Sequence, residues 1–187
     1  KKGDNVVRGQ KIAEGGATGA PLHATISGKV KPIDKRPHPT LVSVESIVIA
    51  RDGEAEQEFF EDPGWRSLAR EEMLERVREA GIVGLGGAAF PTYRKLTLPP
   101  GVAVDTFILN GAECEPYLTS DHRLMLEEPE AIVEGALAMA RLIGVKRAMV
   151  GIEADKMPAV ESLRAAARNV PMGEQTFEAV PCEVRYP

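Results

Sequence analysis

The chain has 187 residues, of which 43% are hydrophobic and 27% are charged, and its formal net charge is −5. This composition is typical of a globular protein, and the length allows one domain or two small ones. Nucleic acid is excluded as an expected partner, because phosphate binding requires a basic surface and the acidic chain has no basic block.

Two cysteines, Cys114 and Cys182, are present. They are too few for a four-cysteine zinc site or for an iron–sulfur cluster held by this chain alone, and they form no disulfide framework. A reducing, cytoplasmic setting is therefore expected. The apolar-rich segment 131–145 is interrupted by Glu134 and Arg141. No segment approaches the roughly 20 apolar residues of a membrane helix, and no signal peptide is recognisable.

Residues 1–50 are predicted to form a small all-β module. The segments "GDNVVRGQKIAE" and "HATISGKVKPID" are short strand-like runs between glycines, in a region with few helix signals. Residues 51–65 are expected to be a linker, and residues 66–187 an α/β domain. Lys1 is not a natural first residue and the chain stops directly after a strand-like run, so we expect both ends to be cut from a longer protein.

The second domain is expected to alternate helices and strands. "SLAREEMLERVREAG" has apolar residues at helical spacing, and Gly81 is a suitable C-terminal cap. Further helices are predicted from Pro129 to Gly144 and over "KMPAVESLRAAARN", each with a proline near its start. Strands are predicted at "VDTFILN", "RAMVGIE" and "FEAVPCEVRY". This alternation predicts a parallel, Rossmann-like α/β layer.

The segment "GIVGLGGAAF", residues 81–90, contains the G-x-G-x-x-G/A string of dinucleotide-binding folds. That motif needs a strand before it and a helix after it, whereas here a helix leads in and Pro91 interrupts any long outgoing helix. Two interpretations remain open. The run is a glycine-rich connector, or it is a flat cradle whose backbone lies against an aromatic ring system or a phosphate, with Lys95 supplying positive charge.

A second motif, "ILNGAECEPYLTSDHRLMLEEP", begins where a predicted strand ends. Asn110 lies at the carboxyl end of that strand, where open α/β sheets bind ligands. Glu113 and Glu115 flank Cys114. Two interpretations of the acids are open. They are solvated loop charges, or they accept N–H and ribose hydroxyl groups of a ligand. In the second interpretation, Asn110 hydrogen-bonds an edge of the same ligand. Cys114 and His122 also leave a thiol hydrolase open.

Together, "GIVGLGGAAFPTYRKL" and "ILNGAECEPYLTSDHRLM" closely resemble the RnfC family, which belongs to the Rnf complex, a bacterial ion-translocating ferredoxin:NAD oxidoreductase. They are more distantly similar to the flavin- and NADH-binding subunit of respiratory complex I and to a cobalamin reductase of bacterial microcompartments. "GDNVVRGQKIAE…LHATISGKV" resembles the barrel-sandwich module of the RnfC family, so the resemblance covers nearly the whole chain.

The resemblance implies that the isoalloxazine of FMN lies against the glycine run. Gly84, Gly86 and Gly87 would form the cradle. Lys95 would face the phosphate, and Phe90 would border the nucleotide pocket. The run departs from the related sequences at two positions: Leu85 stands where the flavin-binding protein of complex I has an arginine, and Ala89 replaces a common glycine.

The resemblance also implies roles for the second motif. Asn110, Glu113 and Cys114 would line the flavin, and Glu115 would reach toward the nicotinamide nucleotide. The implied chemistry is hydride transfer between NAD(H) and FMN, followed by single-electron transfer. The implied partners are the other Rnf subunits at the cytoplasmic face of the membrane, without direct insertion. No side chain of this chain is expected to be catalytic. No metal ligand is expected either, because the 4Fe–4S clusters of the family belong to a later cysteine-rich segment.

Two alternatives to this function stay open, a flavin-dependent cobalamin reductase and a docking subunit without catalysis. The β module also resembles lipoyl and biotinyl carrier domains, which need a lysine at the hairpin between their half-repeats. The corresponding hairpin here, "EGGATGAPLH" at residues 14–23, has none, so no swinging cofactor is expected.

Overall fold

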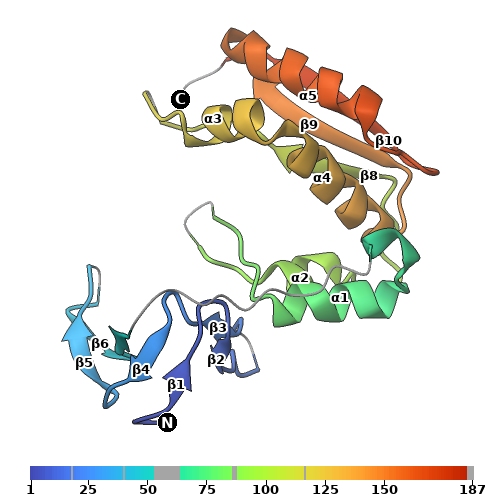
Figure 1. Ribbon diagram of the computed structural model, residues 1–187. Helices are drawn as coiled ribbons and strands as arrows, with labels where there is room; N and C mark the ends of the chain where they lie inside the picture. Colours follow the sequence, from blue (N-terminus) through green and yellow to red (C-terminus); the bar gives the residue numbers. More distant parts are fainter. Residues whose placement is uncertain (18, 40, 53–63, 86–87, 116, 185–187) are drawn as a thin grey trace. The chain divides into compact units, whose positions relative to one another are not determined.

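The computed structural model describes the chain except for residues 18, 40, 53–63, 86–87, 116 and 185–187 (Figure 1). The contacts divide the chain into two compact units, here called unit 1 and unit 2. Unit 1 consists of residues 1–64 and 74–94, and unit 2 of residues 65–73 and 95–187. Residues 74–94 thus group with the N-terminal module, whereas the sequence placed them in the second domain. Most of the predicted linker 51–65 lies outside the described residues, and the predicted boundaries remain a prediction.

The first 50 residues form short antiparallel strands, which confirms the predicted all-β module. The strands are β1 Asn5–Val6, β2 Lys11–Ala13, β3 Leu22–His23, β4 Gly28–Val30, β5 Asp34–Pro37, β6 Ser43–Ser46 and β7 Ile49–Arg51. They pair in the order β1-β4-β7 and as the hairpins β2-β3 and β5-β6. Val6, Ala24 and Val30 are the buried side chains of this small core.

The helix before the glycine run is α1, Arg70–Glu79, as predicted, and it is followed by Gly81 in a left-handed conformation with φ of 66°. A Cβ atom on Gly81 would lie 2.5 Å from the Pro21 carbonyl oxygen, so both the conformation and the space require glycine. Within unit 1, Lys11 Nζ lies 2.5 Å from Glu79 Oε2. This hydrogen bond raises the pKa of Lys11 and lowers the pKa of Glu79.

Unit 2 is built on a parallel sheet in the order β10-β9-β8, as predicted. Its strands are β8 Thr106–Asn110, β9 Arg147–Glu153 and β10 Thr176–Cys182. The helices after residue 91 are α2 Thr92–Leu96, α3 Ser120–Glu127, α4 Pro129–Ile143 and α5 Met157–Asn169. Short 3-10 turns, η1 Trp65–Ser67 and η2 Ala154–Lys156, precede α1 and α5. Both α2 and α3 were absent from the prediction.

Helices α4 and α5 lie on the same face of the sheet (Figure 1). Alternate residues of β9, namely Ala148, Val150 and Ile152, are completely buried. They pack in clusters that include Leu137 of α4 and Leu163 of α5. The apolar stripes that predicted these two helices are therefore the stripes that cover the sheet, and burial of apolar area is the main stabilising term.

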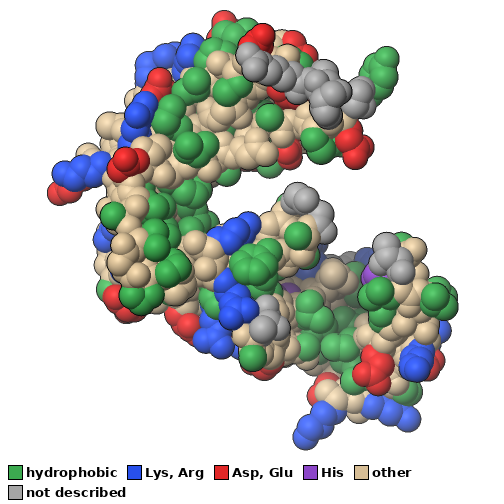
Figure 2. Space-filling view, turned by 180° about the vertical axis from the view of Figure 1, so that it is seen from behind, with side chains coloured by type: hydrophobic (Ala, Val, Ile, Leu, Met, Phe, Trp, Pro, Cys, Tyr) green, Lys and Arg blue, Asp and Glu red, His purple; other side chains and the backbone are tan. Residues whose placement is uncertain are grey.

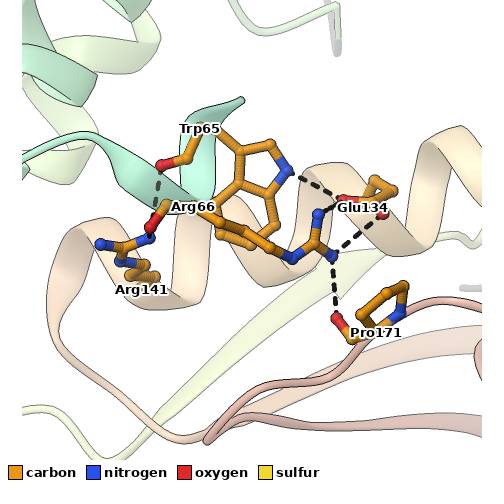
Figure 3. Close-up of polar contacts among 5 residues, drawn as sticks. All are labelled: Trp65, Arg66, Glu134, Arg141 and Pro171. Carbon is orange, nitrogen blue, oxygen red and sulfur yellow. Dashed lines mark hydrogen bonds and ion pairs between the residues drawn. The ribbon is translucent and has the colours of Figure 1, made fainter. Parts of the chain in front are cut away.

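A cluster of polar contacts around Trp65 attaches η1 to the helical layer of unit 2 (Figure 3). Trp65 Nε1 donates to Glu134 Oε2 at 2.9 Å, and Arg66 Nη1 lies 2.8 Å from the same oxygen. Arg66 Nη2 also donates to the Pro171 carbonyl oxygen at 2.8 Å. On the other side, Arg141 donates to the carbonyl oxygens of Trp65 and Arg66. The chain that enters unit 2 is thus held on α4 through both backbone and side chains.

On the face shown in Figure 2, Lys and Arg side chains are interspersed with Asp and Glu side chains. Exposed ion pairs of unit 2 include Arg147 with Glu178 at 3.2 Å and Lys146 with Glu174 at 3.8 Å. Among the described residues, no helix combines the length and the apolar character that crossing a membrane requires.

We expect Glu134→Ala to destabilise unit 2 by about 1–2 kcal/mol, because Trp65 and Arg66 lose a shared acceptor at a partly exposed site. Trp65 is the single tryptophan of the chain, so its emission should shift to longer wavelength while urea unfolding moves to lower concentration. Glu161→Ala, at an exposed position of α5, is the control and should stay within about 0.5 kcal/mol of wild type. Equal urea midpoints for Glu134→Ala and Glu161→Ala would contradict the expected contribution of the Trp65 contacts to stability.

Candidate functional site

The carboxyl ends of β8 and β9 lie side by side because the two strands are parallel, with Asn110 opposite Gly151. The Gly111 N–H donates to the Gly151 carbonyl oxygen at 2.9 Å and extends the ladder by one bond. A Cβ atom on Gly111 would lie 3.0 Å from this oxygen and 3.0 Å from Val150 Cγ2. The close approach of the two backbones therefore favours glycine, and the chain leaves the sheet directly after it.

Asn110 is the last residue of β8, and its side chain is exposed. Its Oδ1 accepts a hydrogen bond from the Ala112 N–H at 3.1 Å, which turns the chain away from the sheet. In the described part of the chain Nδ2 donates to no acceptor, so its N–H groups are available to a ligand. The predicted hydrogen bond of Asn110 to a ligand stays a prediction, and Oδ1 already accepts a bond within the chain.

Glu113 points inward: its side chain is only 2% exposed. Oε1 accepts the Asp121 backbone N–H at 2.8 Å and lies 3.5 Å from Ser120 Oγ. Both donors belong to the first turn of α3, whose N-cap residue Thr119 provides no side-chain cap. The Glu113 carboxylate therefore caps α3 from outside the helix, where a negative charge is favourable.

Two residues of the next strand–helix turn, which sequence reasoning missed, complete the surroundings of Glu113. Glu153 ends β9, is buried, and accepts the Glu113 backbone N–H on Oε2 at 3.3 Å. Lys156 ends η2 and places Nζ 3.7 Å from Glu113 Oε2. One signal could have found Glu153, namely its place at the carboxyl end of a predicted parallel strand.

Cys114 and Glu115, the two residues after Glu113, are exposed. Tyr117 has a positive φ of 66°, so the loop bends sharply before α3. Cys114 and His122 share no hydrogen bond in the described residues, and the geometry gives no support to a thiol hydrolase. The loop thus offers a thiol and a carboxylate to solvent while it buries another carboxylate.

A largely apolar pocket of about 330 Å³ lies beside β8 in unit 2. Asn110 contributes an amide and Asp121 a carboxylate to its lining, and Phe107, Leu109 and Leu124 contribute apolar surface. Asn110 therefore stands between the loop and a space that can receive an apolar group.

The described part of the glycine run belongs to unit 1 and forms a closed loop. The Gly84 N–H donates to the Phe90 carbonyl oxygen at 2.9 Å, and Val83 forms an isolated bridge with Pro91. Leu85 at the tip is 95% exposed and Phe90 is 49% exposed. Both side chains are therefore accessible to a ligand.

The structure also describes Ala89 and Lys95, two further positions that stand out in the sequence. Ala89 takes a positive φ of 48°, a conformation that glycine adopts more readily, which accounts for glycine at this place in related sequences. Lys95 is exposed on α2. Gly86 and Gly87 lie outside the described residues. The structure thus brings the four predicted residues from Asn110 to Glu115 together on one loop of unit 2, whereas Gly84 and Phe90 lie on a loop of unit 1.

The family matches divide the chain differently, because the glycine run and the loop after β8 fall within one match. Residues 77–187 match the family of the Nuo51 FMN-binding domain, and residues 1–54 match the RnfC barrel sandwich hybrid domain. Over 89% of its length, the chain is 46% identical to the C subunit of the proton-translocating ferredoxin:NAD(+) oxidoreductase complex of Clostridium ljungdahlii. Over its whole length it is 40% identical to the C subunit of the Na(+)-translocating ferredoxin:NAD(+) oxidoreductase complex of Acetobacterium woodii.

The chain spans 37% and 42% of the length of these two relatives. Among solved structures, it is similar to an NAD+-reducing NiFe-hydrogenase in the air-oxidized state, with 26% identity and a TM-score of 0.54. That match covers 64% of this chain and 21% of the hydrogenase chain. The comparisons confirm the resemblance to the RnfC family that the sequence shows. Residues 1–54 are an RnfC-type barrel sandwich hybrid domain. With residues 77–187, the chain belongs to the family of the Nuo51 FMN-binding domain.

Proposed function

We propose that this chain is the FMN-holding part of an electron-transfer subunit that exchanges electrons with NAD(H) in an ion-translocating ferredoxin:NAD oxidoreductase complex. The observation that carries the proposal is the loop after β8. It combines the family match with an exposed amide donor, an exposed thiol and an exposed carboxylate at the carboxyl edge of a parallel sheet. Ligands bind at this edge in open α/β sheets.

The residues present fit FMN. The isoalloxazine is a flat ring system with ring nitrogens and carbonyl oxygens along one edge, and Asn110 provides an exposed side-chain donor for such an edge. Ala88 and Ala89 are exposed and provide backbone with little side-chain cover. A phosphate needs N–H donors and positive charge, and an exposed Lys95 comes shortly after this loop in the chain.

We assign the glycine run to the cofactor. Gly84, Gly86 and Gly87 form the cradle for the ring, Lys95 binds the phosphate, and Phe90 borders the nucleotide pocket. The 49% exposure of Phe90 supports this assignment, because a side chain packed into the core would be buried. The glycines act through the absence of Cβ atoms, which lets the backbone approach a flat ring.

We assign the loop after β8 to orientation of the cofactor and of the nucleotide. Asn110 donates to the flavin edge, Cys114 lies along the ring, and Glu115 accepts a hydroxyl or N–H group of NAD(H). Glu113 supports the loop from inside, since its side chain is turned toward α3. When FMN is bound, it supplies hydride exchange with NAD(H) and single-electron transfer onward. The chain's own residues bind and orient the two ring systems.

The wider role is inferred from the relatives, which are named as C subunits of ferredoxin:NAD(+) oxidoreductase complexes. By this inference the partners are other subunits of a membrane complex, the chain is peripheral on its cytoplasmic face, and the 4Fe–4S clusters are held outside these 187 residues. The names of the relatives favour this role over a cobalamin reductase or a purely structural docking subunit.

FMN titration of the purified chain tests the proposed cofactor site. We expect saturable quenching of flavin fluorescence by wild type, and an affinity about three- to tenfold lower for Asn110→Ala, because one hydrogen bond to the ring edge is lost. Asn169→Ala, at the exposed end of α5, is the matched control and should bind as wild type does. Absence of quenching by wild type, or equal affinities for all three proteins, would contradict the assignment.

The role of Glu115 is tested by NADH-dependent bleaching of flavin absorbance in the FMN-loaded chain without oxygen. We expect Glu115→Gln to lower the apparent NADH affinity about tenfold, because a charge-assisted hydrogen bond becomes a neutral one, and to leave FMN affinity unchanged. Glu161→Gln on α5 serves as the control. A loss of FMN affinity with unchanged NADH dependence would move Glu115 from the nucleotide to the flavin.

A further inference from the structure

We propose that Glu153 and Lys156 are positioning residues, which act through Glu113 to fix the loop that presents Cys114 and Glu115. Neither residue was among the predicted site residues, and both come from the turn between β9 and α5. The inference deepens the proposed function and rests on it for the identity of the ligand. The anchoring of the loop itself rests on contacts within unit 2.

The first contact fixes the far end of the loop. Glu113 Oε1 accepts the Asp121 N–H at 2.8 Å, although the two residues are eight apart. The hydrogen bond closes the segment 113–121 into a ring whose base is the first turn of α3. Since Thr119 gives no side-chain cap, the helix depends on Glu113 for an acceptor at this N–H.

The second contact fixes the near end. The Glu113 N–H donates to Glu153 Oε2 at 3.3 Å, in a buried environment and 40 residues away in the chain. A buried backbone N–H needs a partner, and the neighbouring strand provides it through a side chain after the ladder has ended. Loss of the Glu153 carboxylate would leave the Glu113 N–H buried and unpaired.

The third contact concerns charge. Glu113 Oε2 is buried and accepts no hydrogen bond from the described residues. The cation facing it is Lys156, whose side chain is 18% exposed and whose Nζ lies 3.7 Å away. A carboxylate this deeply buried is stable only beside a positive charge, so removal of Lys156 would favour rotation of Glu113 toward solvent.

These contacts explain why adjacent residues of the loop face different surroundings. Glu113 is held inside by α3, Glu153 and Lys156, and Cys114 and Glu115 are therefore carried outward. If the Glu113 side chain rotated toward solvent, it would lie beside Cys114 and add a negative charge to the exposed surface. The turn after β9 thus determines which carboxylate the loop offers to a ligand.

Amide hydrogen exchange in the chain without flavin tests the anchoring. The reporters are the Glu113 and Asp121 N–H groups, and the Val150 N–H in buried β9 reports global opening. We expect Lys156→Met and Glu153→Ala to accelerate exchange at the two loop amides about fivefold or more, a coupling within the range for residues in contact, and to change Val150 much less.

Conservative variants and a distant control separate positioning from general stability. Lys156→Arg and Glu153→Gln keep the cation and an acceptor oxygen, and they should exchange nearly as wild type does. Lys146→Met removes an exposed lysine from the same unit and should change neither reporter. In the Glu113→Gln background, Lys156→Met should add little, because Lys156 acts through the charge of Glu113.

Unchanged exchange at Glu113 and Asp121 in Lys156→Met and Glu153→Ala would overturn the proposal. Equal acceleration at Val150 would also overturn it, since the residues would then contribute only to global stability. A parallel FMN titration should show weaker binding for Lys156→Met and recovery for Lys156→Arg. If wild type binds no FMN, the proposed function fails, while the exchange data still decide whether the loop is anchored in this way.

Discussion

The parallel pairing of β8 with β9 is the constraint on which the candidate site depends. It aligns Asn110 with Gly151 and brings the loops after both strands to the same edge of the sheet. Helices α4 and α5 keep the pairing in place by covering one face with apolar side chains. A shift of one residue in register would place Glu153 against a different part of the loop, and the Glu113 N–H would lose its acceptor.

Much of the fold could be predicted because its elements have strong periodic signals. The stripes of α4 and α5 and the buried alternation of β9 follow from apolar burial, which acts on local sequence. Helix α3 was missed for a physical reason. It has eight residues, its N-cap side chain makes no bond, and its capping carboxylate comes from Glu113, outside the helix. Such a helix depends on tertiary contacts that local patterns do not contain.

The sequence did not distinguish the orientations of the residues in the candidate site. Glu113 and Glu115 are equivalent in the sequence, as acids on either side of Cys114, and the structure buries one and exposes the other. Their difference arises from Glu153 and Lys156, which lie 40 and more residues further along the chain. Spacing within the motif carries no information about such partners, whereas the strand-end position of Glu153 does.

The charge around the loop limits what can bind there. Glu113 and Glu153 bring two buried carboxyl groups and Lys156 brings one ammonium group, and Glu115 adds a further acid at the surface. A ligand at this loop therefore meets mainly acceptors and negative potential, which favour N–H and hydroxyl groups and disfavour phosphate. The phosphate of a nucleotide cofactor must find its donors elsewhere. Under the proposed function, Lys95 and backbone N–H groups of the glycine run supply those donors and the positive charge.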